Sequence, residues 1–167
     1  MNRDRPSRSV DWLTVIRRYL IAATAGNVVW ETAQAPLYTV WHTGAAREVV
    51  QAIVHCTLGD ILIATVTLVA ALIAIGSPAW PDQRFGQVLT ATVIFAAGYT
   101  VYSEYVNTVV RHSWSYTSWM PTLPWLGTGL APLAQWMVVP ATALAWAGRV
   151  VPVRKRPPPD KAPQSTT

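Results

Sequence analysis

The chain has 167 residues, a length that fits one domain, and 51% of them are hydrophobic while only 13% are charged. Ten of its 13 Lys and Arg residues lie near the two ends, so the net charge of +5 belongs to the flanks. A nucleic-acid-binding protein would spread its basic residues over a folded face. This composition excludes an ordinary soluble domain and a nucleic-acid partner, and it favours a membrane protein.

The first 18 residues form a basic segment that precedes an apolar run, as they would in a signal peptide. Glu31 interrupts that run, and Pro36 directly follows a small-residue pattern at 33–35 that resembles a cleavage site. A proline at the first mature position is poorly suited to processing. We therefore expect the segment to be retained.

Four apolar segments are long enough to cross ~30 Å of hydrocarbon at ~1.5 Å per residue. They form one predicted domain over residues 19–148, with spans at about 19–40, 49–75, 85–110 and 125–147. The basic, proline-rich tail over residues 149–167 is poor in apolar residues, so we expect it to be disordered. The predicted fold class is all-α, an integral membrane four-helix bundle.

The distribution of basic residues predicts the orientation, because cytoplasmic segments of membrane proteins are enriched in Lys and Arg. With both termini cytoplasmic, the inside holds eleven of the 13 basic residues, and the outside holds only Arg47 and Arg111. Aromatic residues, including Trp41, Trp114 and Trp119, would then line the outer interface.

Polar residues in the four spans fall at similar depths once the topology is set. Measured from the outer ends of the helices, Glu31 lies at ~13 Å, Asp60 at ~16 Å and Gln135 at ~15 Å. His55 and Glu104 both lie at ~9 Å. The inner halves of the spans are almost entirely apolar. The sequence therefore predicts that the polar side chains meet in the outer half of the bundle.

Helical spacing supports this prediction. Glu31 and Gln34 share a stripe with Asn27, and Glu104 shares one with Asn107 and Arg111. In the second span, His55 and Asp60 are five residues apart, or roughly 140° around the axis. These two side chains therefore cannot point in the same direction.

Three acids inside a membrane are costly, at about 2.5–3.5 kcal/mol each on insertion scales, unless they have partners. The bases within reach by sequence are His55 and Arg111. We therefore predict that at least one of Glu31, Asp60 and Glu104 is protonated at neutral pH, or that the three hold a cation.

The candidate residues fall into two groups. The predicted catalytic residues are Glu31, Glu104, Asp60 and His55, and the predicted ligand-binding residues are Gln34, Asn107, Arg111, Gln135, Trp114 and Tyr116. Polar residues also serve as interhelical hydrogen-bond clamps, and the aromatic loop serves either as an interfacial anchor or as a lid. No CxxC, HExxH, GxSxG or glycine-rich phosphate motif occurs, so we predict no cofactor and no metal ion.

The motifs WETAQAPLYTVW, HCTLGD, SEYVNT and SWSYTSWMP resemble a group of small four-helix bacterial membrane proteins. That resemblance implies a multi-pass protein of the bacterial inner membrane. The chain is also more distantly similar to the EXPERA group of sterol isomerases and sigma-2 receptor relatives. The second resemblance implies that Glu31, Asp60 and Glu104 shuffle protons on a polycyclic or isoprenoid lipid.

Three functional hypotheses follow. The first is an acid–base enzyme or binder that acts on a lipid-like or isoprenoid substrate in the carboxylate-rich pocket. The second is a small proton- or cation-coupled transporter, and the third is a structural or assembly subunit. The expected partners are membrane lipids and an apolar small molecule. The sequence leaves open whether the protein is an enzyme and whether it forms a homo-oligomer.

Overall fold

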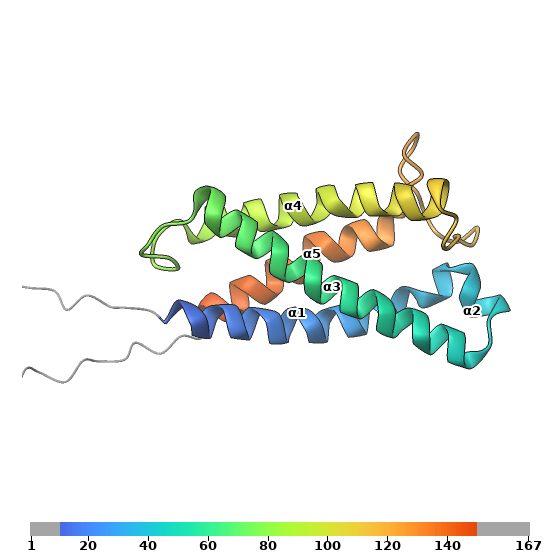
Figure 1. The fold of residues 1–167 in the computed structure, drawn as a ribbon, viewed down its shortest axis with the longest axis horizontal. Helices are drawn as coiled ribbons and strands as arrows, with labels where there is room; N and C mark the ends of the chain where they lie inside the picture. The colour runs from blue at the N-terminus through green and yellow to red at the C-terminus, as the bar shows by residue number, and fades with distance from the viewer. Residues whose placement is uncertain (1–10, 150–167) are drawn as a thin grey trace, which may run out of the picture.

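A computed structural model describes residues 11–149, and every regular element in that range is helical (Figure 1). The four long helices are α1 (Trp12–Gln34), α3 (Ala46–Ile75), α4 (Phe85–Tyr105) and α5 (Leu130–Arg149). The short elements are η1 (Ala35–Leu37), α2 (Thr39–Thr43) and η2 (Val106–Val110). The predicted all-α bundle is confirmed. Of the predicted basic segment 1–18, residues 12–18 belong to α1, and of the predicted disordered tail 149–167, Arg149 belongs to α5; residues 1–10 and 150–167 lie outside the described residues.

The long helices form a ring in which α1 packs against α3 and α5, and α4 packs against the same two helices. Helix α1 begins and α5 ends at one end of the bundle, which we call the terminal end (Figure 1). The connections 35–45 and 111–129 lie at the opposite end, which we call the distal end. Each half of the bundle therefore receives side chains from all four long helices.

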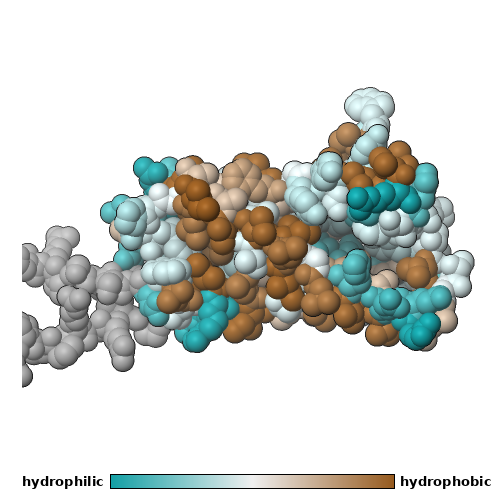
Figure 2. Space-filling model, viewed as in Figure 1, coloured by the Kyte–Doolittle hydropathy of each residue, from teal (hydrophilic) through white to brown (hydrophobic). Residues whose placement is uncertain are grey.

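Three helices in the described range are long and apolar enough to cross a membrane: Ala46–Ile75, Phe85–Val110 and Leu130–Arg149. These helices are typical of a multi-pass membrane protein. Figure 2 shows apolar side chains over the middle of the bundle and hydrophilic ones toward its ends. Helix α1, the first predicted span, is not among the three. Arg17, Arg18 and a stripe of buried polar residues lower its hydropathy.

Helix α1 begins before the predicted start at residue 19 because Asp11 caps it. The Asp11 carboxylate accepts hydrogen bonds from the backbone N–H of Leu13 at 3.1 Å and from the Thr14 hydroxyl at 2.8 Å. The helix ends at Gln34 rather than at residue 40. Pro36 has no N–H to continue the ladder, so the chain tightens into η1.

At the distal end, the helical segment Phe85–Val110 ends where the third span was predicted to end, whereas α5 begins later than predicted. Helix α4 widens into the π-helical turn η2, in which the Arg111 N–H donates to the Val106 carbonyl at 2.8 Å. Helix α5 begins at Leu130 rather than at residue 125, because the preceding loop is held by backbone hydrogen bonds and contains the positive φ of Gly127.

The core changes character along the bundle. Its terminal half is apolar and contains the buried residues Val15, Tyr19, Leu68, Ala71, Val88, Leu144 and Ala147. The buried Thr92 in this half donates to a carbonyl of its own helix at 2.8 Å. The distal half instead buries Asn27, Glu31, Gln34, Asp60, Glu104, Thr128 and Gln135. The fold thus separates an apolar half from a polar one.

Candidate functional site

The three acids on separate helices lie in the same part of the core, and we call them the carboxyl cluster: Glu31, Asp60 and Glu104. They come from α1, α3 and α4, and their exposed fractions are 8%, 6% and 6%. Glu31 faces inward with Asn27 and Gln34 because spacings of four and three residues keep them on one helical stripe. Asp60 begins the buried face of α3 together with Thr57.

Two glutamine side chains connect these helices. The Gln34 amide donates to the Glu31 carboxylate at 2.8 Å and to the Gln135 side-chain carbonyl at 3.1 Å. The Gln135 amide in turn donates to the Asp60 carboxylate at 2.9 Å and to the Asn27 side-chain carbonyl at 3.2 Å. This amide chain joins α1, α3 and α5 and orients both carboxyl groups.

The carboxyl groups of Glu31 and Asp60 lie within hydrogen-bonding reach of each other. Two carboxylates have no hydrogen between them to share, so a hydrogen bond in this position requires a proton on one of the two. The Glu104 carboxyl group lies within electrostatic range of Glu31. The cluster is therefore a pair of acids with a third acid beside it.

Glu104 has its own partners from the distal loop. The Tyr116 hydroxyl donates to the Glu104 carboxylate and accepts a hydrogen bond from the Gly129 N–H at 3.1 Å. The Trp114 indole N–H is buried beside Glu104, but its geometry falls short of a hydrogen bond. Burial, and then the neighbouring Glu104 carboxyl, raise the pKa of the Tyr116 hydroxyl above its ordinary value.

No cation offsets the cluster within residues 11–149, where no arginine or histidine pairs with its carboxyl groups. The two bases that were expected near the acids, His55 and Arg111, are both exposed. The structure therefore brings seven of the ten predicted site residues into one group: Glu31, Gln34, Asp60, Glu104, Trp114, Tyr116 and Gln135. The other three lie apart from it. Asn107 donates to the Ser103 carbonyl of its own helix at 2.9 Å.

Two further side chains lie near the cluster, although neither is among the ten predicted site residues. Tyr38 packs edge-on against Tyr116 with ring centroids 5.5 Å apart, and it lies within electrostatic range of Glu31 and Glu104. Cys56, one turn before Asp60, lies within electrostatic range of all three acids. The shared face of Cys56 and Asp60 is a sequence signal for the cysteine. Helical spacing also places Tyr38 on the stripe of Glu31 and Gln34, although the chain tightens into η1 between Gln34 and Tyr38.

Several buried polar atoms in the distal half have no hydrogen-bond partner among the described residues: Asn27 Nδ2, Gln34 Oε1, Thr57 Oγ1, Trp114 Nε1 and Thr128 Oγ1. Buried polar groups are otherwise almost always paired, because each unpaired one costs about 1–3 kcal/mol. These atoms include both donors and acceptors. They are suited to bind the polar group of a ligand.

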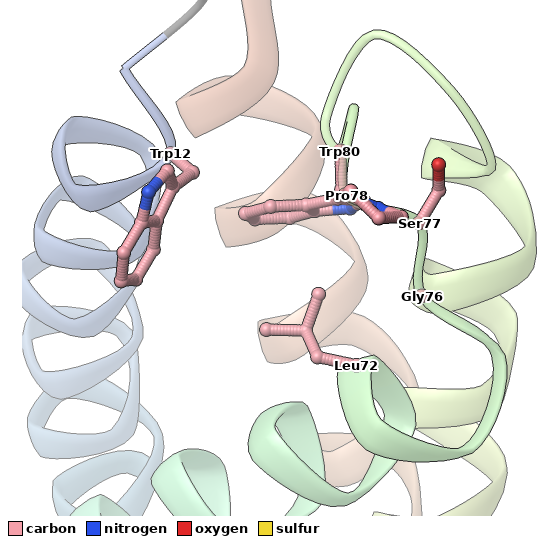
Figure 3. A pocket seen from close by; sticks show the side chains of 6 residues that line it. All are labelled: Trp12, Leu72, Gly76, Ser77, Pro78 and Trp80. Carbon is pink, nitrogen blue, oxygen red and sulfur yellow. The ribbon is translucent and has the colours of Figure 1, made fainter.

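The described residues contain no group of three His, Cys, Asp or Glu side chains arranged to hold a metal ion. A shallow pocket of about 390 Å³ lies at the terminal end, where Trp12 and Trp80 face each other across Leu72 (Figure 3). None of its six lining residues is ionisable. The distal carboxyl cluster is therefore the stronger candidate for chemistry.

No protein-family model, no curated protein and no solved structure matches this chain. The resemblances to bacterial four-helix proteins and to the EXPERA group therefore stay predictions.

Proposed function

We propose that the protein spans the bacterial inner membrane four times, with both termini in the cytoplasm and the distal end toward the periplasm. Helix α1 has 23 residues and is ~34 Å long, which is enough to cross the bilayer. It packs between α3 and α5, so it shares the depth of two apolar helices. The excess of Lys and Arg near the two chain ends supports this orientation.

We propose that the carboxyl cluster binds an apolar, lipid-like molecule and transfers a proton to or from it. The observation that carries this function is the convergence of the buried Glu31 and Asp60 carboxyl groups on the amide chain of Gln34 and Gln135, with no offsetting cation beside them among residues 11–149. A pair that shares one proton contains an acid and a base at the same place. Gln34 and Gln135 hold the pair in position, and Glu104 stabilises positive charge that develops on the substrate.

The other two hypotheses fit the structure less well. A transporter needs a polar path through both halves, whereas the terminal half of the described core is apolar. A purely structural clamp would pair its polar atoms, whereas Asn27 and Gln34 each keep one unpaired buried atom. Acid–base chemistry or binding on an apolar ligand accounts for both observations.

The test is to identify the apolar molecules that copurify with the protein in detergent. We expect such a molecule with the wild type and much less of it with Glu31→Gln, Asp60→Asn and Glu104→Gln, all of them folded by circular dichroism. Asp82→Asn is the matched control, because Asp82 is an exposed carboxylate in the loop before α4. Equal recovery from all variants would contradict the proposal. Proton flux in proteoliposomes would favour the transporter instead.

A further inference from the structure

The distal part of α3 has an inward face that the rest of the chain leaves partly uncovered. No residue from 46 to 56 is buried, whereas buried positions recur on this helix from Thr57 onward. The half-buried residues in this part are apolar and form the distal stripe: Val49, Ala52, Ile53 and Cys56. Together with Asp60 they fall within an arc of roughly 100° at 3.6 residues per turn. The distal stripe therefore continues the face that carries Asp60.

The neighbouring helices leave room along this stripe. Helices α3 and α4 lie together near the terminal end and diverge toward the distal end (Figure 1). The face shown in Figure 2 is hollowed between the distal parts of these two helices. Helices α1 and α5 pack closely on the other side of the bundle. The stripe is therefore reached from the side of the bundle, between α3 and α4.

The distal end itself is closed by backbone pairing between the two connections. The Thr39 N–H donates to the Ser115 carbonyl at 3.0 Å, and the Thr117 N–H donates to the Leu37 carbonyl at 2.9 Å. Between these two bonds, Tyr116 reaches down to Glu104. A molecule approaching along the bundle axis would have to break these contacts, whereas a molecule dissolved in the membrane would not.

The inner end of the stripe meets the carboxyl cluster. The Cys56 side chain lies within electrostatic range of Glu31, Asp60 and Glu104, and Tyr38 lies within the same range of the thiol. The cluster offers carboxyl oxygens and the unpaired Gln34 Oε1 as acceptors, beside the unpaired donors Asn27 Nδ2 and Trp114 Nε1. A polar group that donates hydrogen bonds or carries positive charge complements this arrangement, whereas an anionic group would be repelled.

We propose that the distal stripe is the binding site of an elongated apolar molecule with a small hydrogen-bond-donating head group, either a hydroxyl or an ammonium group. The molecule enters sideways from the membrane between α3 and α4. Its body lies along Val49, Ala52 and Ile53, and its head reaches the carboxyl cluster past Cys56. This proposal rests on the proposed function, for which it specifies the class of ligand and the route.

The test uses photoactivatable diazirine probes with a long alkyl chain and either an amine, an alcohol or a carboxylate head, added to the full chain in nanodiscs. We expect the amine and alcohol probes to label the peptide that contains residues 49–56, and the carboxylate probe to label it about tenfold less. An excess of unlabelled long-chain amine should compete with this labelling in the wild-type protein. Uniform labelling of lipid-facing positions by all three probes would overturn the proposal.

Two variants on the same helix separate the stripe from the lipid surface. Ala52→Phe fills the stripe and should lower labelling about tenfold. Val50→Phe is the control, because Val50 is 60% exposed, and it should leave labelling unchanged. Equal labelling of both variants would overturn the proposal. The competition experiment needs no substitution, so it decides the question even if Ala52→Phe does not fold.

Cys56 is the single cysteine of the chain. Oxidative crosslinking through Cys56 therefore tests whether a second copy of the chain, and not a small molecule, occupies the distal stripe. Efficient formation of a disulfide-linked dimer would show a second copy of the chain at the stripe and overturn the proposal. Failure here is distinct from failure of the proposed function. If the probes label the distal stripe but no carboxyl group of the cluster is protonated, only the proposed proton transfer is contradicted. If Glu31 and Asp60 share a proton but the probes do not label the stripe, only the proposed entry route is contradicted.

Discussion

The side-chain amide of Gln135 donates a hydrogen bond of 2.9 Å to the carboxylate of Asp60, across the core from α5 to α3. The same amide binds Asn27, and its carbonyl accepts from Gln34. Gln135 is only 1% exposed. One neutral side chain thus positions both halves of the Glu31–Asp60 pair.

Replacing Gln135 with leucine should therefore destabilise the protein. The substitution keeps the size of the side chain but replaces a polar amide with an apolar group, so it removes partners from Asn27, Gln34 and Asp60 in a buried site. We expect a loss of about 1–3 kcal/mol in unfolding free energy, seen as a lower melting temperature in detergent. Met137→Leu is the control, because Met137 lies on the same helix and is 55% exposed. Equal melting temperatures of the two variants would show that the hydrogen bonds of Gln135 contribute nothing to the free energy of unfolding.

Alkaline titration should show Tyr116 as a late-ionising tyrosine. Burial, and then the hydrogen bond to Glu104, raise the pKa of Tyr116 above its ordinary value of 10.0. The folded state therefore keeps this proton when the unfolded state has lost it, so the contribution of this group to stability falls as the pH rises above 10.0. The absorbance difference between wild type and Tyr116→Phe should show a tyrosine that ionises above pH 10.0. A difference spectrum in which this tyrosine ionises like a solvent-exposed one would show that the Tyr116 hydroxyl is in water and not buried against Glu104.

Two glycine substitutions should have opposite effects on stability. A Cβ atom at Gly148 would lie 2.7 Å from the Phe85 ring, so Gly148→Ala should cost about 1–3 kcal/mol through overpacking between α5 and α4. A Cβ atom at Gly98 would meet nothing within 4 Å. Gly98→Ala should therefore be neutral or should stabilise α4 by about 0.5–1 kcal/mol. Thermal unfolding in detergent measures both changes. Tolerance of Gly148→Ala would mean that α4 and α5 pack less closely than described.

His55→Ala should leave the carboxyl cluster intact. The imidazole is exposed on α3 and lies away from Asp60, so its loss removes no partner from the three acids. We expect melting within about 0.5 kcal/mol of the wild type and unchanged copurification of an apolar molecule. Loss of that molecule from the His55→Ala variant would show that the histidine does belong to the binding site.

Helical periodicity predicted the parts of the site that depend on a single helix. The stripe of Glu31 and Gln34 follows from 3.6 residues per turn, and the same periodicity predicts that His55 and Asp60 point in different directions. Alternating spans then brought Asp60, Glu104 and Gln135 to one half of the bundle. The catalytic and binding roles of these residues stay predictions.

The parts that periodicity missed depend on contacts between distant segments. The early start of α1 is due to the Asp11 cap, which the arginine-rich flank obscured. Helical spacing places Tyr38 on the stripe of Glu31 and Gln34, but its pairing with Tyr116 depends on the turn at Pro36 and on the distal loop. Such pairing leaves no period in the sequence. Arg111 was expected to offset an acid, but the π-helical turn before it ends with the side chain exposed.

The central claim is that Glu31 and Asp60 share a proton, and infrared spectroscopy of the carbonyl stretch tests it most directly. The wild-type protein at neutral pH should show the band of a protonated carboxylic acid. That band should be lost or shifted in both Glu31→Gln and Asp60→Asn, and it should be unchanged in the exposed control Asp82→Asn. A wild-type spectrum without such a band, with all three carboxyl groups of the cluster ionised, would contradict the account.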